Sequence, residues 1–131
     1  MERKQKRLVF LDTHVLIWLY DALIDRFSKK AKHLINKNPV LISPFVKLEI
    51  QYLYESNKIK VHPVPVIATL ENSIGLYISH TPLKSIIDVA LTLDWTRDPF
   101  DRLLTAEAIV NNAYFITKDE DILKNYSFSV W

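Results

Sequence analysis

The chain has 131 residues, the length of one domain, and its 49% hydrophobic and 24% charged residues are typical of a packed globular protein. Because cysteine is absent, disulfides, thiol nucleophiles and cysteine-ligated zinc are excluded. The formal net charge of +2 permits a polyanionic partner without indicating one, and no apolar run reaches the roughly 18 residues of a membrane span. We therefore expect one soluble, cytoplasmic domain over residues 1–131.

A basic extension, residues 1–7, precedes the first predicted strand, and its cations are Arg3, Lys4, Lys6 and Arg7. These cations are open to two interpretations, a solvated terminus or phosphate contact. The apolar run at residues 8–11 then predicts a buried parallel strand. It ends at Asp12 and Thr13, which are good helix N-caps, so a helix should follow through Tyr20.

The rest of the chain alternates between predicted helices and strands, whose boundaries are marked by capping residues, prolines and the only glycine. We predict a helix from Ser28 that stops within 36–39, a strand at 40–42, a helix from Pro44 to about Asn57, irregular chain up to Pro65, a helix at 66–73 before Gly75 and a strand at 76–78. After these come helices at 82–93 and from Phe100 to about Asn111, a strand at 114–116, a short helix near Ile122 and a strand at 128–131.

This alternation predicts the fold class. Strands separated by helices of about ten residues imply right-handed crossovers and a parallel sheet covered on both faces. We expect an α/β fold, a three-layer α/β/α sandwich with a central, mainly parallel sheet. In such sheets ligands bind beyond the carboxyl ends of the strands, where Asp12 and Asp119 should emerge.

Three of the candidate site acids have a structural interpretation beside the chemical one. Asp12 between a strand and a helix can be an N-cap alone. Asp98 before Pro99 is a standard helix start, and we favour the cap for it. Asp101 falls at the third position of the same helix, where it would complement the helix dipole, but a helix starting at this edge would also direct it toward Asp12.

Glu49 is the most informative acid on physical grounds. Its predicted helix carries an apolar stripe, and the helical period places Glu49 within that stripe, formed by Phe45, Leu48, Tyr52 and Leu53. Burying an ionised carboxylate costs several kcal/mol unless a cation or strong hydrogen bonds compensate. We therefore expect Glu49 to have a partner such as a metal ion, Arg or Lys.

Asp119 completes a set of four acids, with Asp12, Glu49 and Asp101, although a surface acidic turn would look the same locally. Four carboxylates converging on one crevice would match the all-oxygen site that Mg²⁺ or Mn²⁺ prefers. Without a cation such acids repel one another, so we expect raised pKa values. Bound ions would activate water and neutralise charge at a phosphodiester.

Other site chemistries find no support. The chain lacks the glycine-rich nucleotide-binding patterns, the serine hydrolase elbow and the zinc-protease histidine pair. Its four histidines show no short metal-ligand spacing, and each is expected to be a surface or packing residue: His14, His33, His62 and His80. Only His14 adjoins the acids.

Four segments in order along the chain resemble one family: Leu11–Trp18 (LDTHVLIW), Ser43–Ile50 (SPFVKLEI), Asp98–Leu104 (DPFDRLL) and Thr117–Asp119 (TKD). The chain resembles PIN-domain proteins, especially the VapC-like toxins of bacterial and archaeal toxin–antitoxin pairs. The resemblance implies the PIN fold and an endoribonuclease that depends on Mg²⁺ or Mn²⁺. It also implies a homodimer, and an antitoxin that inserts into or covers the active site.

The resemblance further implies roles for individual residues. Asp12, Glu49, Asp101 and Asp119 match the family's acidic quartet, Asp98 is an additional candidate metal ligand, and Thr117 resembles the hydroxyl residue that accompanies the last acid. Three cations near these motifs are expected either to meet substrate phosphates or to balance the charge of the acids: Arg97, Arg102 and Lys118.

Three alternative functions stay open at this point. One is a PIN nuclease for RNA processing without an antitoxin, and another is a PIN fold that binds RNA without cutting it. A third, from a different class, is a Mg²⁺-binding phospho-acceptor receiver domain. Receivers place their acids on loops after strands, whereas Glu49 is predicted inside a helix, which disfavours this last alternative.

Overall fold

The computed structural model of the protein describes residues 6–131, so Arg3 and Lys4 of the predicted basic extension lie outside the described residues. Within them, five parallel strands form one sheet in the order β3-β2-β1-β4-β5. The strands are Val9–Leu11 (β1), Val40–Ile42 (β2), Tyr77–Ile78 (β3), Tyr114–Ile116 (β4) and Ser129–Val130 (β5). In the central register, Phe10 pairs with Leu41 on one side and with Phe115 on the other.

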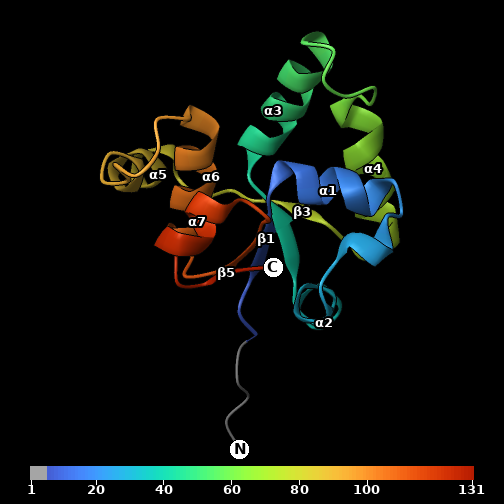
Figure 1. Cartoon of the computed structure of the whole chain (residues 1–131), viewed down its shortest axis with the longest axis horizontal. Helices are drawn as coiled ribbons and strands as arrows, with labels where there is room; N and C mark the ends of the chain where they lie inside the picture. The colour runs from blue at the N-terminus through green and yellow to red at the C-terminus, as the bar shows by residue number, and fades with distance from the viewer. Residues whose placement is uncertain (1–5) are drawn as a thin grey trace, which may run out of the picture.

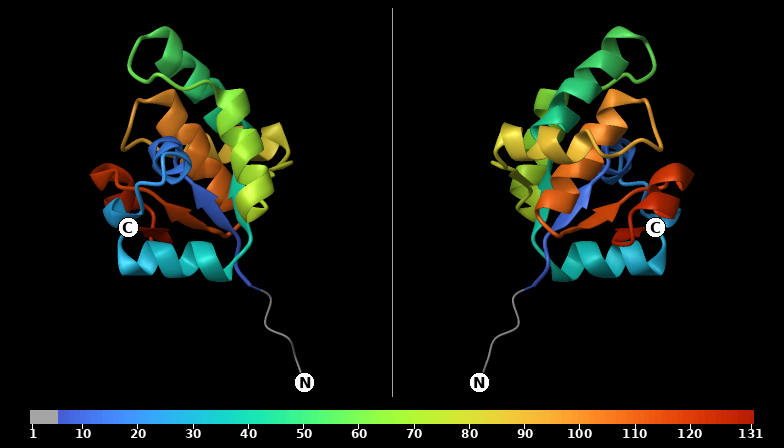
Figure 2. Two further views of the ribbon diagram at one scale, coloured as in Figure 1. Left: turned by 90° about the vertical axis from the view of Figure 1, so that its right-hand side faces the viewer. Right: turned by 90° about the vertical axis from the view of Figure 1, so that its left-hand side faces the viewer.

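Helices connect the strands of residues 6–131 and cover both faces of the sheet. They are Thr13–Tyr20 (α1), the 3-10 helix Ile24–Arg26 (η1), Lys29–Lys37 (α2), Pro44–Glu55 (α3), Pro63–Ile74 (α4), Leu83–Ala90 (α5), Pro99–Val110 (α6) and Glu120–Asn125 (α7). In Figure 1 the sheet lies between α5, α6 and α7 on one side and α1, α2 and α4 on the other. Figure 2 shows α2 at the end of the molecule opposite α3. The predicted three-layer α/β/α sandwich is confirmed.

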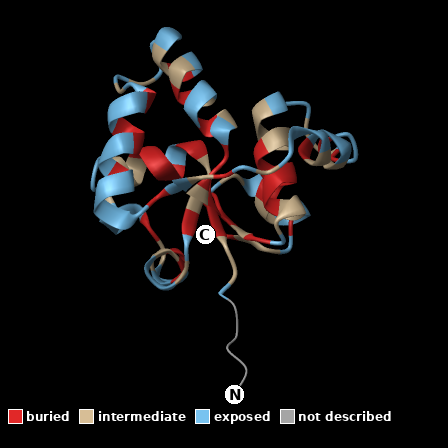
Figure 3. Ribbon diagram, turned by 180° about the vertical axis from the view of Figure 1, so that it is seen from behind, coloured by how far each residue is buried: buried red, intermediate tan, exposed pale blue. Residues whose placement is uncertain are grey.

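The core forms around β1, whose residues are all buried, as expected for the central strand of a covered parallel sheet. Phe10 and Phe115 are the largest of the fully enclosed side chains. Buried residues occupy the strands and the inward faces of the helices, while the outward faces are exposed (Figure 3). This packing fixes where each strand ends and therefore where the following residues emerge. None of the helices in residues 6–131 is long and apolar enough to cross a bilayer.

Several element boundaries differ from the prediction. The helix predicted at 66–73 begins at Pro63, where irregular chain was expected. Prolines at 63 and 65 are tolerated because backbone N–H groups in the first helical turn have no intrahelical partner. Helix α3 ends at Glu55 instead of Asn57, since Asn57 has a left-handed φ of 58°. Helix α5 is shorter than predicted, and η1 was not predicted.

One buried acid breaks the apolar pattern of the core. Glu107 on α6 is fully buried, and both of its carboxylate oxygens lack a hydrogen-bond partner within residues 6–131. The hydroxyl of Thr105 on the same helix is also buried without a partner. A buried polar group without a partner costs about 1–3 kcal/mol, more when it is charged. Glu107 is therefore a local weakness of the fold.

We predict that Glu107→Gln raises the midpoint of thermal unfolding by a few degrees, equivalent to about 1–2 kcal/mol. A neutral amide of the same shape costs less to bury than an ionisable carboxyl group. Differential scanning calorimetry would measure the change. Glu71→Gln on the exposed face of α4 is the control and should leave the midpoint unchanged. A lower midpoint for Glu107→Gln would show that an unseen partner satisfies this carboxylate.

Candidate active site

The acids predicted from the sequence meet at the carboxyl end of the sheet, where α1, α3 and α7 begin close to the end of β1 (Figure 1). A cavity of about 340 Å³ opens there. Five carboxylates line it: Asp12, Glu49, Asp98, Asp101 and Asp119. The remaining lining residues are His14, Val15, Trp18 and Lys118. The four acids expected to act together, and the additional candidate Asp98, are therefore neighbours in space.

Asp12 is held by both of its carboxylate oxygens. The backbone N–H of Thr13 donates to Oδ1 at 2.8 Å, and the hydroxyl of Thr117 donates to Oδ2 at 2.7 Å. The same hydroxyl accepts from the backbone N–H of Asp119 at 3.0 Å. Burial raises the pKa of Asp12 above its ordinary value, although the hydrogen bonds from Thr117 and Thr13 act in the opposite direction.

Thr117, which was expected to bind substrate, lies below the surface of the cavity. Its side chain is fully buried, and its hydroxyl is shared between Asp12 and Asp119. A hydroxyl has one proton to donate, and here Asp12 receives it. Thr117 therefore positions the two acids beneath the cavity, and it does not line the cavity.

Glu49 lies in the cavity for a reason other than the one predicted. Leu48 and Tyr52 are more than half exposed, so the predicted buried stripe is wrong. The buried face of α3 consists instead of Val46, Ile50 and Leu53, and Glu49 stands partly buried beside it. Its partner is Thr13, whose hydroxyl donates to Oε1 of Glu49. Burial raises the pKa of Glu49 to about 6, with a further contribution from Asp12.

Asp98 and Asp101 share the first turn of α6. Asp98 is the N-cap, as favoured from the sequence, and its Oδ1 accepts from the backbone N–H of Asp101 at 3.0 Å. The pKa of Asp101 shows the effect of the neighbouring acids most clearly. Burial raises its pKa to about 7, and the negative charges of Asp98, Asp119, Asp12 and Glu49 add to the effect. The pKa values of Asp12, Glu49 and Asp101 are thus raised as expected, but burial is the main cause and mutual repulsion the smaller one.

Asp119 caps α7 in the same way, since its Oδ1 accepts from the backbone N–H of Ile122 at 3.0 Å. Asp98 and Asp119 each use Oδ1 for the cap, and no hydrogen bond within residues 6–131 occupies either Oδ2. A capping role and a ligand role therefore do not compete at these two residues. For Asp98 the cap expected from the sequence is therefore present, and it leaves one carboxylate oxygen free of hydrogen bonds within residues 6–131.

Of the three predicted cations, one lines the cavity. Lys118 does so, directly before Asp119. Arg102 does not, because its guanidinium donates to the backbone oxygens of Thr96 at 2.7 Å and Ala90 at 3.4 Å. Arg97 is exposed and outside the cavity lining. Arg102 therefore holds the segment before α6 against this helix through hydrogen bonds. Its position outside the cavity lining does not support the expected contact with substrate.

The donor chemistry fits a hard divalent cation. In the part of the chain that the structure describes, the single ion pair is Lys84 with Asp88, so no cavity carboxylate has a basic side chain within ion-pair distance. All-carboxylate oxygen sets suit Mg²⁺ or Mn²⁺. Among residues 6–131 no three acidic or histidine side chains already stand as a metal-holding group. The side chains of the cavity acids would therefore have to move closer together to share one cation.

Comparison with known proteins places this geometry in a family. The PIN domain matches residues 9–128, which is nearly the whole chain. The chain belongs to the PIN-domain family. This assignment confirms the resemblance seen in the four sequence segments and sets aside the receiver-domain alternative.

One curated protein and two solved structures are similar to this PIN-domain protein. Ribonuclease VapC22 of Mycobacterium tuberculosis is 30% identical over 118 residues, which cover 85% of this chain and 86% of that protein. A crystal structure of VapBC2 from Rickettsia felis, bound to a DNA fragment from their promoter, superposes with a TM-score of 0.66 at 19% identity, over 95% and 97% of the chains. A toxin-antitoxin complex from Klebsiella pneumoniae gives 0.64 at 16% identity, over 94% and 96%. The two structures confirm the fold.

The structure adds Thr13 and Trp18 to the site of this PIN-domain protein. Thr13 was read as a helix cap, but its hydroxyl holds Glu49 across from α1 to α3. Trp18 has no predicted role beyond its place in the first helix, but it lines the cavity. The helical period could have indicated Trp18, because it lies one turn beyond His14 on the face that carries the site.

We predict that the metal-free protein loses stability as the pH rises from about 4 to about 7. The pKa of Asp101 is about 7 in the folded state, against 3.8 ordinarily, so the folded protein keeps a proton that the unfolded chain has already released. Glu49, at about 6, acts in the same direction. Thermal unfolding in EDTA at pH 5 and pH 8 would show the lower midpoint at pH 8.

Asp101→Asn should reduce this pH dependence and raise the midpoint at pH 8, because it removes a repelled charge and leaves the Asp98 cap intact. The matched control is Asp94→Asn, on an exposed residue outside the cavity. An equal pH dependence in the wild type and in Asp101→Asn would contradict the assignment of the effect to Asp101.

Proposed function

We propose that this PIN-domain protein is an endoribonuclease that depends on Mg²⁺ or Mn²⁺ and acts as the toxin of a toxin–antitoxin pair. One observation carries the proposal: five carboxylates, four from strand ends or helix starts and one from the middle of α3, line a single cavity without a basic ion-pair partner in residues 6–131. Such a set is costly for the fold and is explained by a cation that it holds. The similarity to Ribonuclease VapC22 supports RNA as the substrate.

In this proposal Asp12, Glu49, Asp101 and Asp119 are the residues that would hold the cation, with Asp98 as a further candidate ligand. When bound, the cation supplies an activated water nucleophile and charge neutralisation at the scissile phosphate. The water oxygen forms the new bond to phosphorus as the bond from phosphorus to the leaving oxygen breaks. Asp101, whose pKa is about 7, is partly protonated at neutral pH, and it would release this proton on becoming a ligand.

Residues around the acids have supporting roles. Thr117 and Thr13 fix the carboxylates of Asp12 and Glu49, so that the orientation of the ligands is set before a cation arrives. Lys118 is the cation of the cavity lining and is placed to meet a substrate phosphate. Arg97 is exposed nearby in sequence and is a weaker candidate for the same task.

The partners of the protein belong to the same proposal. The similar structures from Rickettsia felis and Klebsiella pneumoniae are a VapBC assembly and a toxin-antitoxin complex, which supports an antitoxin as partner here. A homodimer and a cytoplasmic site of action are proposed on the family resemblance. A PIN nuclease that processes RNA without an antitoxin is the competing candidate, and the growth experiment below separates the two.

We predict that the pure protein cuts total RNA when Mg²⁺ or Mn²⁺ is added and that EDTA abolishes the cutting. Asp12→Asn and Asp101→Asn should each lose at least about 100-fold in rate, because each removes a charged ligand. Gel analysis of the cleaved RNA would measure this loss. The Asp94→Asn control should keep the wild-type rate. Undiminished cutting in EDTA would overturn the metal-dependent mechanism.

We further predict that induced expression of the protein in a bacterial host arrests growth, whereas Asp101→Asn does not. The physical reason is that cleavage of cellular RNA requires the intact acids. Growth curves and immunoblots at matched protein levels provide the measurement. A wild-type protein that cleaves RNA in vitro but leaves growth unchanged would favour the RNA-processing alternative over the toxin.

A further inference from the structure

One wall of the acidic cavity is aromatic. Trp18, on the second turn of α1, lines the cavity together with the acids and is only partly buried. Its ring lies 6.4 Å from that of His14, which also lines the cavity. A metal site for phosphodiester hydrolysis needs carboxylates and cations, and the proposed chemistry has no use for an indole. Trp18 is therefore a cavity residue without an assigned role.

The indole of Trp18 is held in place from outside the cavity. Trp131 packs against it edge to face with ring centroids 5.7 Å apart, and the buried Phe27 packs on Trp131 at 5.5 Å. These contacts hold the ring in place, and Trp18 nevertheless stays partly exposed and lines the cavity. A fixed, partly exposed indole loses little conformational entropy when a flat ligand stacks on it.

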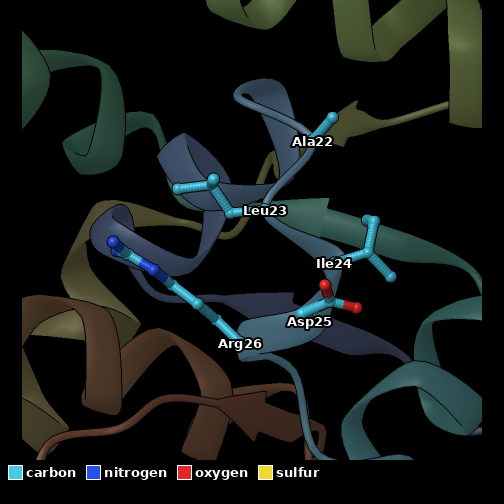
Figure 4. Close-up of a pocket in the computed structure, with 5 residues that line it drawn as sticks. All are labelled: Ala22, Leu23, Ile24, Asp25 and Arg26. Atoms are coloured by element: carbon cyan, nitrogen blue, oxygen red, sulfur yellow. The ribbon is translucent and has the colours of Figure 1, made fainter.

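Two cations flank this aromatic group. The Nζ atom of Lys118 lies 5.5 Å from the ring centroid of Trp131, and Lys118 itself lines the cavity. The Cζ atom of Arg26 lies 5.5 Å from the ring centroid of Trp18. Figure 4 shows the Arg26 side chain extending from η1 in the opposite direction to Ile24. Aromatic faces flanked by basic groups are the usual surface for single-stranded nucleic acid.

We propose that Trp18 is a stacking platform for one nucleobase of a single-stranded RNA, next to the phosphate that enters the acidic cavity. Lys118 and Arg26 meet the phosphates that flank this base. The proposal rests on the proposed ribonuclease function and adds a substrate class to it. Stacking suits this site because it binds RNA without adding positive charge that would compete with the metal for the carboxylates.

The preference for a single strand follows from the platform. A base inside a duplex has both faces covered by its neighbours, so its ring is not available to an indole. A base in a loop or a single-stranded tail is available. Stacking accepts any base, so the platform selects unpaired RNA first and gives only a modest preference among the bases.

The test combines one substitution in the protein with one deletion in the RNA. Cleavage is measured on a short single-stranded oligoribonucleotide, and on copies in which one nucleotide beside the cleaved bond lacks its base. For the wild type we expect the missing base at one position to raise KM about tenfold or more, with kcat changed by less than about threefold. For Trp18→Leu, KM should already be raised on the intact RNA, and the same missing base should have no further effect.

Two further variants separate stacking from packing. Trp18→Phe should recover most of the loss in KM, because a phenyl ring also stacks. Trp95→Leu is the matched control, since Trp95 is equally half-buried but lies outside the cavity lining. A KM for Trp18→Leu within twofold of the wild type, or equal sensitivity of both proteins to the missing base, would overturn the proposal. Preference for a fully paired duplex over the single strand would overturn it as well.

A binding experiment tests the inference without requiring RNA cleavage and without requiring that Trp18→Leu folds. Stacking of a base on an indole quenches its fluorescence, so the wild type titrated with a DNA oligonucleotide of the same sequence, in Mg²⁺, should be quenched. A DNA lacking the critical base should quench markedly less. If the protein cleaves no RNA but is quenched in this way, the ribonuclease proposal fails and the platform stands. Equal quenching by both DNAs, or none, overturns the platform.

Discussion

The site depends on the double anchoring of one carboxylate. Asp12 closes β1, caps α1 through the N–H of Thr13, and accepts from Thr117 at the end of β4. Two neighbouring strands and a helix are thereby tied at the point where they meet. Thr13 extends the connection to Glu49 on α3, and Thr117 extends it to the start of α7. Side chains that are distant in sequence thus share one short hydrogen-bonded path.

That path holds like charges together against their repulsion. Burial is the main reason that the pKa values of Glu49 and Asp101 are raised, and the negative charges of neighbouring acids raise them further. The fold tolerates this repulsion at the carboxyl end of the sheet because burial of the apolar core, centred on Phe10 and Phe115, stabilises the folded state. The acidic site therefore lowers the free energy of unfolding, and the apolar core raises it.

Local sequence signals were sufficient for the strands and for most helix starts. Unbroken apolar runs, and caps such as Ser28 and Asp98, act within a few residues, so their effect is readable without the fold. The stripe from which the burial of Glu49 was predicted is only half right, since Leu53 and Phe45 pack inward while Leu48 and Tyr52 are exposed. Helical period gives the angle between residues but not which side of the helix faces the core. The hydrogen bonds of Arg102 depend on how the loop before α6 folds back toward the helix, which no helix or strand pattern encodes. The helical period could place Trp18 on the face of α1 that carries the site, but not its contact with Trp131, which is far away in the sequence.

The capping by Asp12 and Asp98 has an electrostatic consequence for the cavity. Helices α1 and α6 both begin there, so the positive ends of two helix dipoles, each equivalent to roughly half an elementary charge, point toward the acids. These fixed partial charges moderate the field of the carboxylates before any cation binds. They would likewise oppose a cation placed among the acids and so weaken its binding. The backbone thus acts as a permanent, weak counterion to the carboxylates of the cavity.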